Sequence, residues 1–325
     1  MEKETFIKNQ EIRTVKIEEL LSKYPPEYIC ENKEYCYKKA LSVFKNQEGE
    51  IKFSRYFGKA LTGKEILELS DVEIIPTSSY FDYQSDYSEN TYYMNFADKL
   101  LFGYYDASNF AQDEIQTLEM PLLAACSNYI DENKTETLRA YTVEKNQPTP
   151  FIFYNVPYWL HIEISPDRNS PKNIYGRNFR NASKELLDEL IKPVEKDISL
   201  NIIAARAPAG GNGEYKKSEI EYFLKCSVLA FEAAVRNAAN SSKVTIHSGN
   251  FGTGAFGNSI EMSYLIQLIA AGLAGVKTLY IHAADEEVLE KTKNMISDLP
   301  QELSFEEIVD FLEGLKLTWQ TSDFN

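Results

Sequence analysis

The sequence HSGNFGTGAFGN, residues 247–258, decides the fold that we expect for this chain. Four of the chain's 15 glycines lie within nine positions of this stretch, 249–257, and the stretch itself lies between a strand pattern and a helix pattern. Glycine lacks the side chain that blocks close approach, so such a loop aims backbone amides and the positive helix end at a phosphate. We therefore expect a phosphate-binding loop. A tight turn without a ligand is the alternative, although one or two glycines would suffice for it.

Outward from this loop, strands alternate with helices along the chain. The expected strands span 72–76, 151–164 with an interruption at Pro157, 200–207, 243–248 and 277–283. The first expected helix begins at Ser218, with a capping box to Glu221. Further helices are expected at 260–274, 285–297 and 304–315, the last with a capping box at Ser304 and Glu307. This alternation predicts an α/β fold with substantial parallel pairing.

The beginning of the chain has a different pattern. From Lys16 to about Leu69 apolar residues recur at helical spacing, which predicts a helical region at 1–70 and a main domain at 71–325. The Tyr-rich stretch 78–93 and the turn-rich stretch 165–183 have no helical period, so we expect both to be loops.

Charge restricts the classes of ligand. The chain has 325 residues, with 34 Lys plus Arg against 49 Asp plus Glu, a formal net charge of −15 and a pI near 4.8. An acidic protein is repelled from DNA, RNA and anionic lipid, so we expect no nucleic-acid and no membrane partner. The sequence shows neither a long apolar run nor a signal peptide, which predicts a cytoplasmic protein.

Cysteine and histidine are too scattered for a metal site. The four cysteines contain no Cys-x-x-Cys pair, and the three histidines lie far apart in the sequence. This pattern is typical of a reducing compartment and of neither a disulfide scaffold nor a zinc site. We expect no metal and no cofactor, and we expect carboxylates and backbone groups to carry the chemistry.

The glycine loop also matches the dinucleotide fingerprint, as Gly252-x-Gly254-x-x-Gly257. Asp285 follows the next strand, where the ribose-binding acid of such a site would lie. This match gives a less favoured hypothesis, an NAD-dependent dehydrogenase. The fingerprint normally opens its domain, whereas here it lies near the end of the chain.

The segments GNFGTGAFG (249–257) and SYLIQLIAAGLAGVKTLYIHAAD (263–285) together resemble the C-terminal part of poly(ADP-ribose) glycohydrolases. That family has a similar Gly-Asn-Trp-Gly-x-Gly-x-Phe-Gly stretch. The resemblance implies a macrodomain-like mixed sheet flanked by helices, here with an N-terminal helical extension. It also implies that the loop wraps the diphosphate of ADP-ribose. The implied ligand-binding residues are Gly249, Asn250, Gly252, Thr253, Gly254, Ala255, Phe256 and Gly257.

A second part of the resemblance lies upstream. The family has Asp-Phe-Ala-Asn, then three glycines, then Gln-Glu-Glu, and this chain has NFAD at 95–98, LLFGYYDASNFA and then QDEI at 112–115. The resemblance implies that Glu114 is the general acid that then activates water, and that Asp113 holds the ribose hydroxyls. The implied binding residues here are Asn95, Asp98, Gly103 and Gln112.

Glycoside chemistry explains the need for carboxylates. Cleaving an O-glycosidic bond passes through an oxocarbenium-like state, so the leaving oxygen needs a proton and the cation needs a nearby negative charge. A general acid at position 114 needs a raised pKa, from burial or from the neighbouring Asp113. We therefore expect a hydrolase acting on a terminal or single ADP-ribose unit, with ADP-ribose or an ADP-ribosylated macromolecule as its partner.

Departures from the family pattern give the main alternative. Phe102-Gly103-Tyr104 stands where the family has three glycines, and these bulky residues would obstruct or reshape the pocket. Asp113 is one methylene shorter than the family's Glu, and Asp98 places a charge where the family has an amide. The alternative is a catalytically weak or inactive ADP-ribose-binding module. At the strand end His282 replaces an aromatic stacking partner, although a histidine bonded within the fold is the simpler interpretation.

Overall fold

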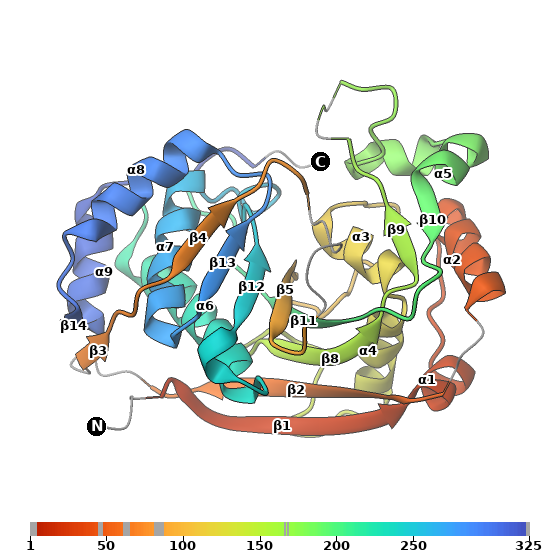
Figure 1. Cartoon of the computed structure of the whole chain (residues 1–325), viewed down its shortest axis with the longest axis horizontal. Coiled ribbons are helices and arrows are strands. Elements are labelled where there is room, and N and C mark those ends of the chain that lie inside the picture. The colour runs from red at the N-terminus through yellow and green to blue at the C-terminus, as the bar shows by residue number, and fades with distance from the viewer. Residues whose placement is uncertain are drawn as a thin grey trace.

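An eight-stranded sheet runs through the molecule (Figure 1). The computed structural model describes residues 5–44, 48–60, 66–80, 88–165, 167 and 169–322. The strands, in their order across the sheet, are β1 (Ile7–Lys16), β2 (Glu50–Gly58), β8 (Phe151–Pro157), β11 (Ser199–Ala205), β5 (Thr91–Phe96), β12 (Thr245–Ser248), β13 (Thr278–Ile281) and β4 (Glu73–Pro76). From β11 to β4 the neighbours are parallel, and from β1 to β11 they are antiparallel. The expected mixed α/β sheet flanked by helices is confirmed.

Strand β11 shows why the sheet is covered on both faces. Its residues from Leu200 to Ala205 are all buried, and all of them except Asn201 are apolar. Successive side chains of a strand point to opposite faces, so Ile203 packs into one core and Ile202 into the other. The sheet thus separates two hydrophobic cores.

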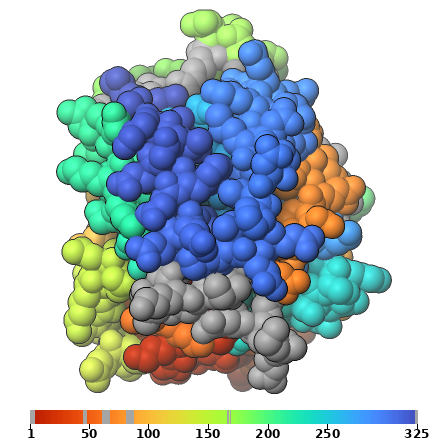
Figure 2. All heavy atoms as spheres, turned by 90° about the vertical axis from the view of Figure 1, so that its left-hand side faces the viewer, coloured from red at the N-terminus to blue at the C-terminus, as the bar shows by residue number. Residues whose placement is uncertain are grey.

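Helices cover the two faces. The core around Ile203 contains α6 (Lys217–Asn237) and α7 (Ile260–Ala274), with α8 (Glu286–Ser297) and α9 (Phe305–Gly314) outside them. Figure 2 shows α8 and α9 together on one face of the molecule. The opposite core contains α1 (Ile17–Lys23), α2 (Glu31–Val43), α3 (Gln112–Glu119), α4 (Leu122–Glu132) and α5 (Lys184–Leu190). Within the described residues, no helix is long and apolar enough to cross a membrane.

The first 70 residues hold more than helices. Helices α1 and α2 lie where helical spacing predicts them, but β1 and β2 flank them and belong to the main sheet. Strand β1 escapes prediction because it is an edge strand with mostly polar residues, and only its pairing with β2 makes it a strand. The expected N-terminal helical region therefore contains helices, but its strands make it part of the main sheet and not a separate helical extension.

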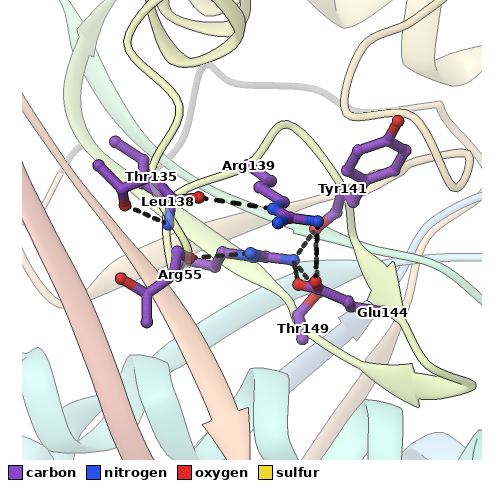
Figure 3. Close-up of polar contacts among 8 residues, drawn as sticks. Arg55, Thr135, Leu138, Arg139, Tyr141, Glu144 and Thr149 are labelled. Carbon is purple, nitrogen blue, oxygen red and sulfur yellow. Dashed lines mark hydrogen bonds and ion pairs between the residues drawn. The ribbon is translucent and has the colours of Figure 1, made fainter.

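Buried Arg55 on β2 ties a distant segment to the sheet (Figure 3). Its guanidinium donates to the carbonyl oxygens of Thr137 and Tyr141 at 2.8 and 2.9 Å, and to Glu144 and Thr149 at 3.0 Å each. A buried cation needs such bonds because desolvation without partners is costly. The segment 137–149 is thereby fixed beside β2.

Element boundaries differ from the sequence expectations in three places. Helix α6 begins at Lys217 rather than Ser218, because the carboxylate of Glu219 accepts the Lys216 amide at 2.9 Å. Strand β5 begins inside the expected loop 78–93, of which residues 81–87 lie outside the described residues. A 3-10 helix, η1 (Gly176–Asn181), interrupts the loop 165–183. Helix α7 and the capping box of α9 are confirmed.

Short elements complete the structure. These are β3 (Ile66–Glu68), β6 (Val143–Glu144), β7 (Gln147–Pro148), β9 (Leu160–Ile162), β10 (Ile191–Pro193), β14 (Glu302–Ser304) and η2 (Ser241–Lys243). Strands β9 and β10 pair beside α3, while β3 and β14 pair at the opposite end of the molecule (Figure 1).

Candidate functional site

A pocket of about 340 Å³ opens at the carboxyl ends of the parallel strands. Ligands of open α/β sheets bind at this edge, because loops and helix N-termini converge there. Two segments singled out in the sequence line it together, the start of α3 and the loop 249–258 after β12, which we call the anion loop. The predicted residues in its lining are Asp98, Gln112, Asp113, Glu114, Gly249, Asn250, Gly252, Thr253, Gly254, Ala255 and Phe256.

The carbonyl groups of the anion loop are almost all hydrogen-bonded to the protein. Those of Gly249, Asn250, Phe251, Gly252, Gly254, Ala255, Phe256 and Gly257 accept bonds from backbone or side-chain donors. Among the described residues, the amides of Gly252, Gly254, Ala255 and Phe256 donate no such bond. Free amides without competing carbonyls form a cradle for an anion. The loop therefore has the donors that a phosphate needs.

Two glycines of the anion loop are required by the protein itself. Gly252 has φ +77°, and a Cβ there would lie 2.4 Å from the Cβ of Ala207. Gly257 has φ +78°, and a Cβ there would lie 3.0 Å from the carbonyl oxygen of Gln320. Side chains are strained at such φ values and have no space here. The glycine spacing thus fixes the path of the loop as well as access to its amides.

The carboxylate pair lies opposite, in the first turn of α3. Glu114 is 6% exposed and Asp113 is 8% exposed. One oxygen of Glu114, Oε2, accepts the amide of Ala111 at 2.9 Å, and Oδ1 of Asp113 accepts the side-chain amide of Asn95 at 3.1 Å. Gln112 bonds the end of β5 through its side chain, which fixes the start of the helix. Both carboxyl groups are held in place and face the pocket.

Burial changes the proton affinity of Asp113. It raises the pKa of Asp113 well above its usual range, the negative charge of Glu114 raises that pKa further, and the hydrogen bond from Asn95 lowers it. Lys33 on α2 is buried on the same side, where its ammonium donates to the carbonyl of Tyr105 at 3.0 Å. Burial lowers the pKa of Lys33 to about 8, against the opposing charge of Glu114. Asp113 therefore retains its proton more readily than an exposed aspartate does.

Three predicted residues do not line the pocket. Asn95 lies behind Asp113, and Gly257 lies at the outer side of the anion loop, beside Gln320. Gly103 lies in an exposed turn, where its amide donates to the carbonyl of Leu100 at 3.1 Å. These three residues are therefore not positioned for the direct contacts with a ligand in the pocket that the sequence predicts.

The two bulky residues beside Gly103 point in different directions. Phe102 has φ +52°, is fully buried and packs against Phe153 with ring centroids 5.4 Å apart. The expectation that Phe102 obstructs the pocket is therefore wrong, because the core holds its ring. Tyr104 does line the pocket and is 44% exposed. Asp98 also lines the pocket, and its carboxylate accepts the amide of Lys99 at 2.5 Å.

Two loops contribute aromatic residues that sequence reasoning missed. Tyr80, after β4, and Tyr175, before η1, both line the pocket. Their rings are nearly parallel, at 18°, with centroids 6.5 Å apart. Each lies in a stretch that the sequence marks only as loop, and no periodic or spacing signal could have brought the two together.

Residues near the end of β13 have internal roles. His282 lines the pocket and bonds His247 at 2.8 Å and Thr77 at 3.1 Å through its two ring nitrogens. It is thus a histidine bonded within the fold. Asp285 caps α8, where its carboxylate accepts the amide of Val288 at 3.1 Å, and it is absent from the pocket lining. Asp285 is therefore not placed to bind the ribose of a dinucleotide in this pocket. Among the described residues no group of three His, Cys, Asp or Glu side chains is arranged to hold a metal.

Part of the chain matches a known protein family. A family model described as poly(ADP-ribose) glycohydrolase, macro domain fold, matches residues 167–290. Among curated proteins no significant match was found.

Several solved structures are similar to this chain. The poly(ADP-ribose) glycohydrolase of Thermomonospora curvata is 11% identical with a TM-score of 0.39, over 86% of this chain and 85% of that chain. The same enzyme bound to the inhibitor ADP-HPD is 11% identical with a TM-score of 0.45, over 80% and 98%. The glycohydrolase of Deinococcus radiodurans in complex with ADP-ribose is 10% identical with a TM-score of 0.43, over 89% and 95%.

The matched residues include strands β11, β12 and β13 and the anion loop, which lies on one side of the pocket. Residues 167–290 are thus similar to the poly(ADP-ribose) glycohydrolase family, and the chain has the macro domain fold that the family model describes.

Proposed function

We propose that this protein hydrolyses O-glycosidic ADP-ribosyl linkages and takes a terminal or single ADP-ribose unit. One observation supports this more than any other. Four unbonded amides of the anion loop and a buried carboxylate pair line the same pocket. The first group suits a diphosphate, and the second suits acid–base chemistry at a sugar. The match of residues 167–290 to the glycohydrolase family model supports the same activity.

Binding would rest on the backbone. Among the described residues that line the pocket, none is Lys or Arg, so the amides of Gly252, Gly254, Ala255 and Phe256 would carry the negative diphosphate. Asp98, Asp113 and Glu114 lie in the same pocket and disfavour a second diphosphate near them. This distribution of charge favours one ADP-ribose unit over a long polyanionic chain.

Catalysis would rest on Glu114. Its Oε2 is held by the Ala111 amide, which fixes the carboxyl group at the start of α3. In the proposed reaction Glu114 gives a proton to the leaving oxygen as the anomeric C–O bond breaks. The resulting carboxylate stabilises the oxocarbenium-like state and then removes a proton from the attacking water. Asp113, held by Asn95, would orient the ribose hydroxyls and help to keep a proton at the pair.

A catalytically weak or inactive ADP-ribose-binding module is the second candidate. Tyr104 favours it, because this side chain lines the pocket where the family has glycine. Replacing Tyr104 with Gly would raise hydrolysis if the ring obstructs the substrate. An unchanged rate in Tyr104→Gly would remove the main reason for this alternative.

Two assays test the proposal. Calorimetric titration with ADP-ribose and with NAD identifies the ligand, and release of ADP-ribose from modified polymer and modified protein measures catalysis. We expect ADP-ribose to bind, and we expect the wild-type protein, but not Glu114→Gln, to release it. If both proteins bind ADP-ribose and neither releases it, the binding module is correct. Absence of ADP-ribose binding at millimolar concentration would reject both functions.

A further inference from the structure

The last described segment of the chain, residues 315–322, packs against the outer side of the anion loop; we call it the C-terminal segment. Trp319 is only 8% exposed and stacks on Tyr215, with centroids 4.6 Å apart. Its backbone amide donates to the carbonyl of Gly213 at 2.9 Å, and its indole donates to Glu219 at 3.1 Å. The segment is therefore docked on the protein.

A glycine makes this docking possible. A Cβ at Gly211 would lie 1.9 Å from the indole ring of Trp319, which no side chain can accommodate. The loop that contains Gly211 also approaches the anion loop, since the amide of Gly210 donates to the carbonyl of Phe256 at 3.2 Å. The C-terminal segment and the loop at 208–211 thus form one support behind the anion loop.

The support holds three consecutive carbonyl groups. The hydroxyl of Ser322 donates to the carbonyl of Ala255 at 2.7 Å, and the amide of Gln320 donates to that of Gly257 at 2.9 Å. The carbonyl of Phe256, between them, is bonded to Gly210. All three bonds come from outside the loop.

Because of peptide geometry, these carbonyl bonds also determine the direction of the neighbouring amides. In a planar trans peptide the C=O of one residue and the N–H of the next point in opposite directions. Fixing the Ala255 carbonyl on Ser322 therefore turns the Phe256 amide away from the support. Fixing the Gly257 carbonyl on Gln320 turns the Asn258 amide toward Gly252, whose carbonyl it bonds at 3.1 Å. The first amide is one of the four free donors, and the second closes the loop.

We propose that Ser322 and Gln320 are positioning residues for diphosphate binding, through the carbonyl groups that they hold. The inference rests on the proposed function, because it assumes that the free amides bind the ligand's diphosphate. It follows that displacing the C-terminal segment weakens binding of diphosphate-containing ligands without changing a group that touches them.

Ser322→Ala tests the first bond. It removes the hydroxyl that holds the Ala255 carbonyl, and Ser322→Thr retains one. Thr321→Val is the matched control, because Thr321 is exposed and its hydroxyl makes no hydrogen bond within the described residues. We expect Ser322→Ala to bind ADP-ribose roughly three- to tenfold more weakly, in line with the loss of one hydrogen bond. Ser322→Thr and Thr321→Val should bind like the wild type.

A second ligand separates positioning from general damage. Adenosine lacks the diphosphate, so its affinity should be the same in wild type and Ser322→Ala, as measured by calorimetry. Equal weakening of both ligands, or unchanged ADP-ribose affinity, would overturn the inference. The double variant Gln320→Pro/Ser322→Ala also removes the amide that holds Gly257, and we expect roughly tenfold weaker ADP-ribose binding or more.

Inorganic pyrophosphate separates the two proposals. If the wild type binds pyrophosphate but not ADP-ribose, the proposed function is wrong, and weaker pyrophosphate binding by the double variant still supports the positioning role. If the wild type binds both ligands and the double variant binds both equally well, the positioning role is wrong and the proposed function stands. If the wild type binds neither, both proposals are wrong.

Discussion

The two sides of the pocket present different kinds of chemistry. On the anion loop the proposed ligand groups are backbone amides, in a loop whose carbonyl groups are bonded to the protein. At the start of α3 they are two carboxyl side chains, held by Ala111 and Asn95. Backbone donors persist when most side chains change, whereas a side-chain carboxyl group is lost with one substitution. Binding and catalysis should therefore respond to different mutations.

The largest effect should come from the carboxylate side. Glu114→Gln removes the proton donor while keeping the side-chain shape, so we expect the rate of ADP-ribose release to fall about 10²- to 10⁴-fold. Affinity for ADP-ribose should change little, because the anion loop is untouched. Rate assays and calorimetry on the same preparations measure both, with Asp131→Asn, an exposed carboxyl group on α4, as the control. A parallel loss of binding and rate would contradict the separation of roles.

The anion loop should respond to a backbone change instead. Gly252→Ala forces a Cβ against Ala207 at a positive φ, so we expect the protein to lose about 1–3 kcal/mol of stability. ADP-ribose binding should weaken roughly tenfold or more, because the free amides move. Thr321→Val, outside the loop, alters only an exposed side chain and should bind within about threefold of wild type. Urea unfolding and calorimetry distinguish the two, and equal effects of both substitutions would contradict a backbone site.

This contrast also explains what the sequence could predict. Gly252 and Gly257 mark the anion loop in the sequence because local backbone conformation demands glycine there. Glu114 could be placed only through its spacing from a family motif, since acidic pairs are common at helix starts. The direction of Phe102 and the meeting of Tyr80 with Tyr175 depend on contacts between distant segments, which leave no local pattern. Strand β1 was missed for the same reason.

The raised pKa of Asp113 should make the stability of the protein depend on pH. Its pKa is raised in the folded state by burial and by Glu114, so the fold favours its neutral form. Its contribution to stability is therefore greatest below the unfolded pKa and is lost as pH rises through the folded pKa. Asp113→Asn is neutral at every pH, so the variant should gain stability relative to wild type between pH 4 and pH 8.

Urea unfolding of both proteins at the two pH values measures this change. If the difference in unfolding free energy between wild type and Asp113→Asn is the same at both pH values, the folded state does not raise the pKa of Asp113. A similar gain in an exposed control, Asp131→Asn, would show that the effect is not specific to the pocket.

The smallest effect should come from Lys33, which reaches the pair only through its charge. That charge lowers the pKa of Asp113, so Lys33→Met should raise that pKa and move the basic limb of the pH–rate profile, on which the pair loses its proton, to higher pH. Lys38→Met, an exposed cation on the same helix, is the matched control and should leave the profile unchanged. Coincident profiles for all three proteins would mean that Lys33 has only a packing role.

A crystal structure of the protein with ADP-ribose tests the central claim most directly. We predict diphosphate oxygens within about 3 Å of the backbone nitrogens of Gly252, Ala255 and Phe256, and the distal ribose beside Glu114. A ligand bound outside this pocket, or a diphosphate held by side chains while those amides remain unbonded, would contradict it.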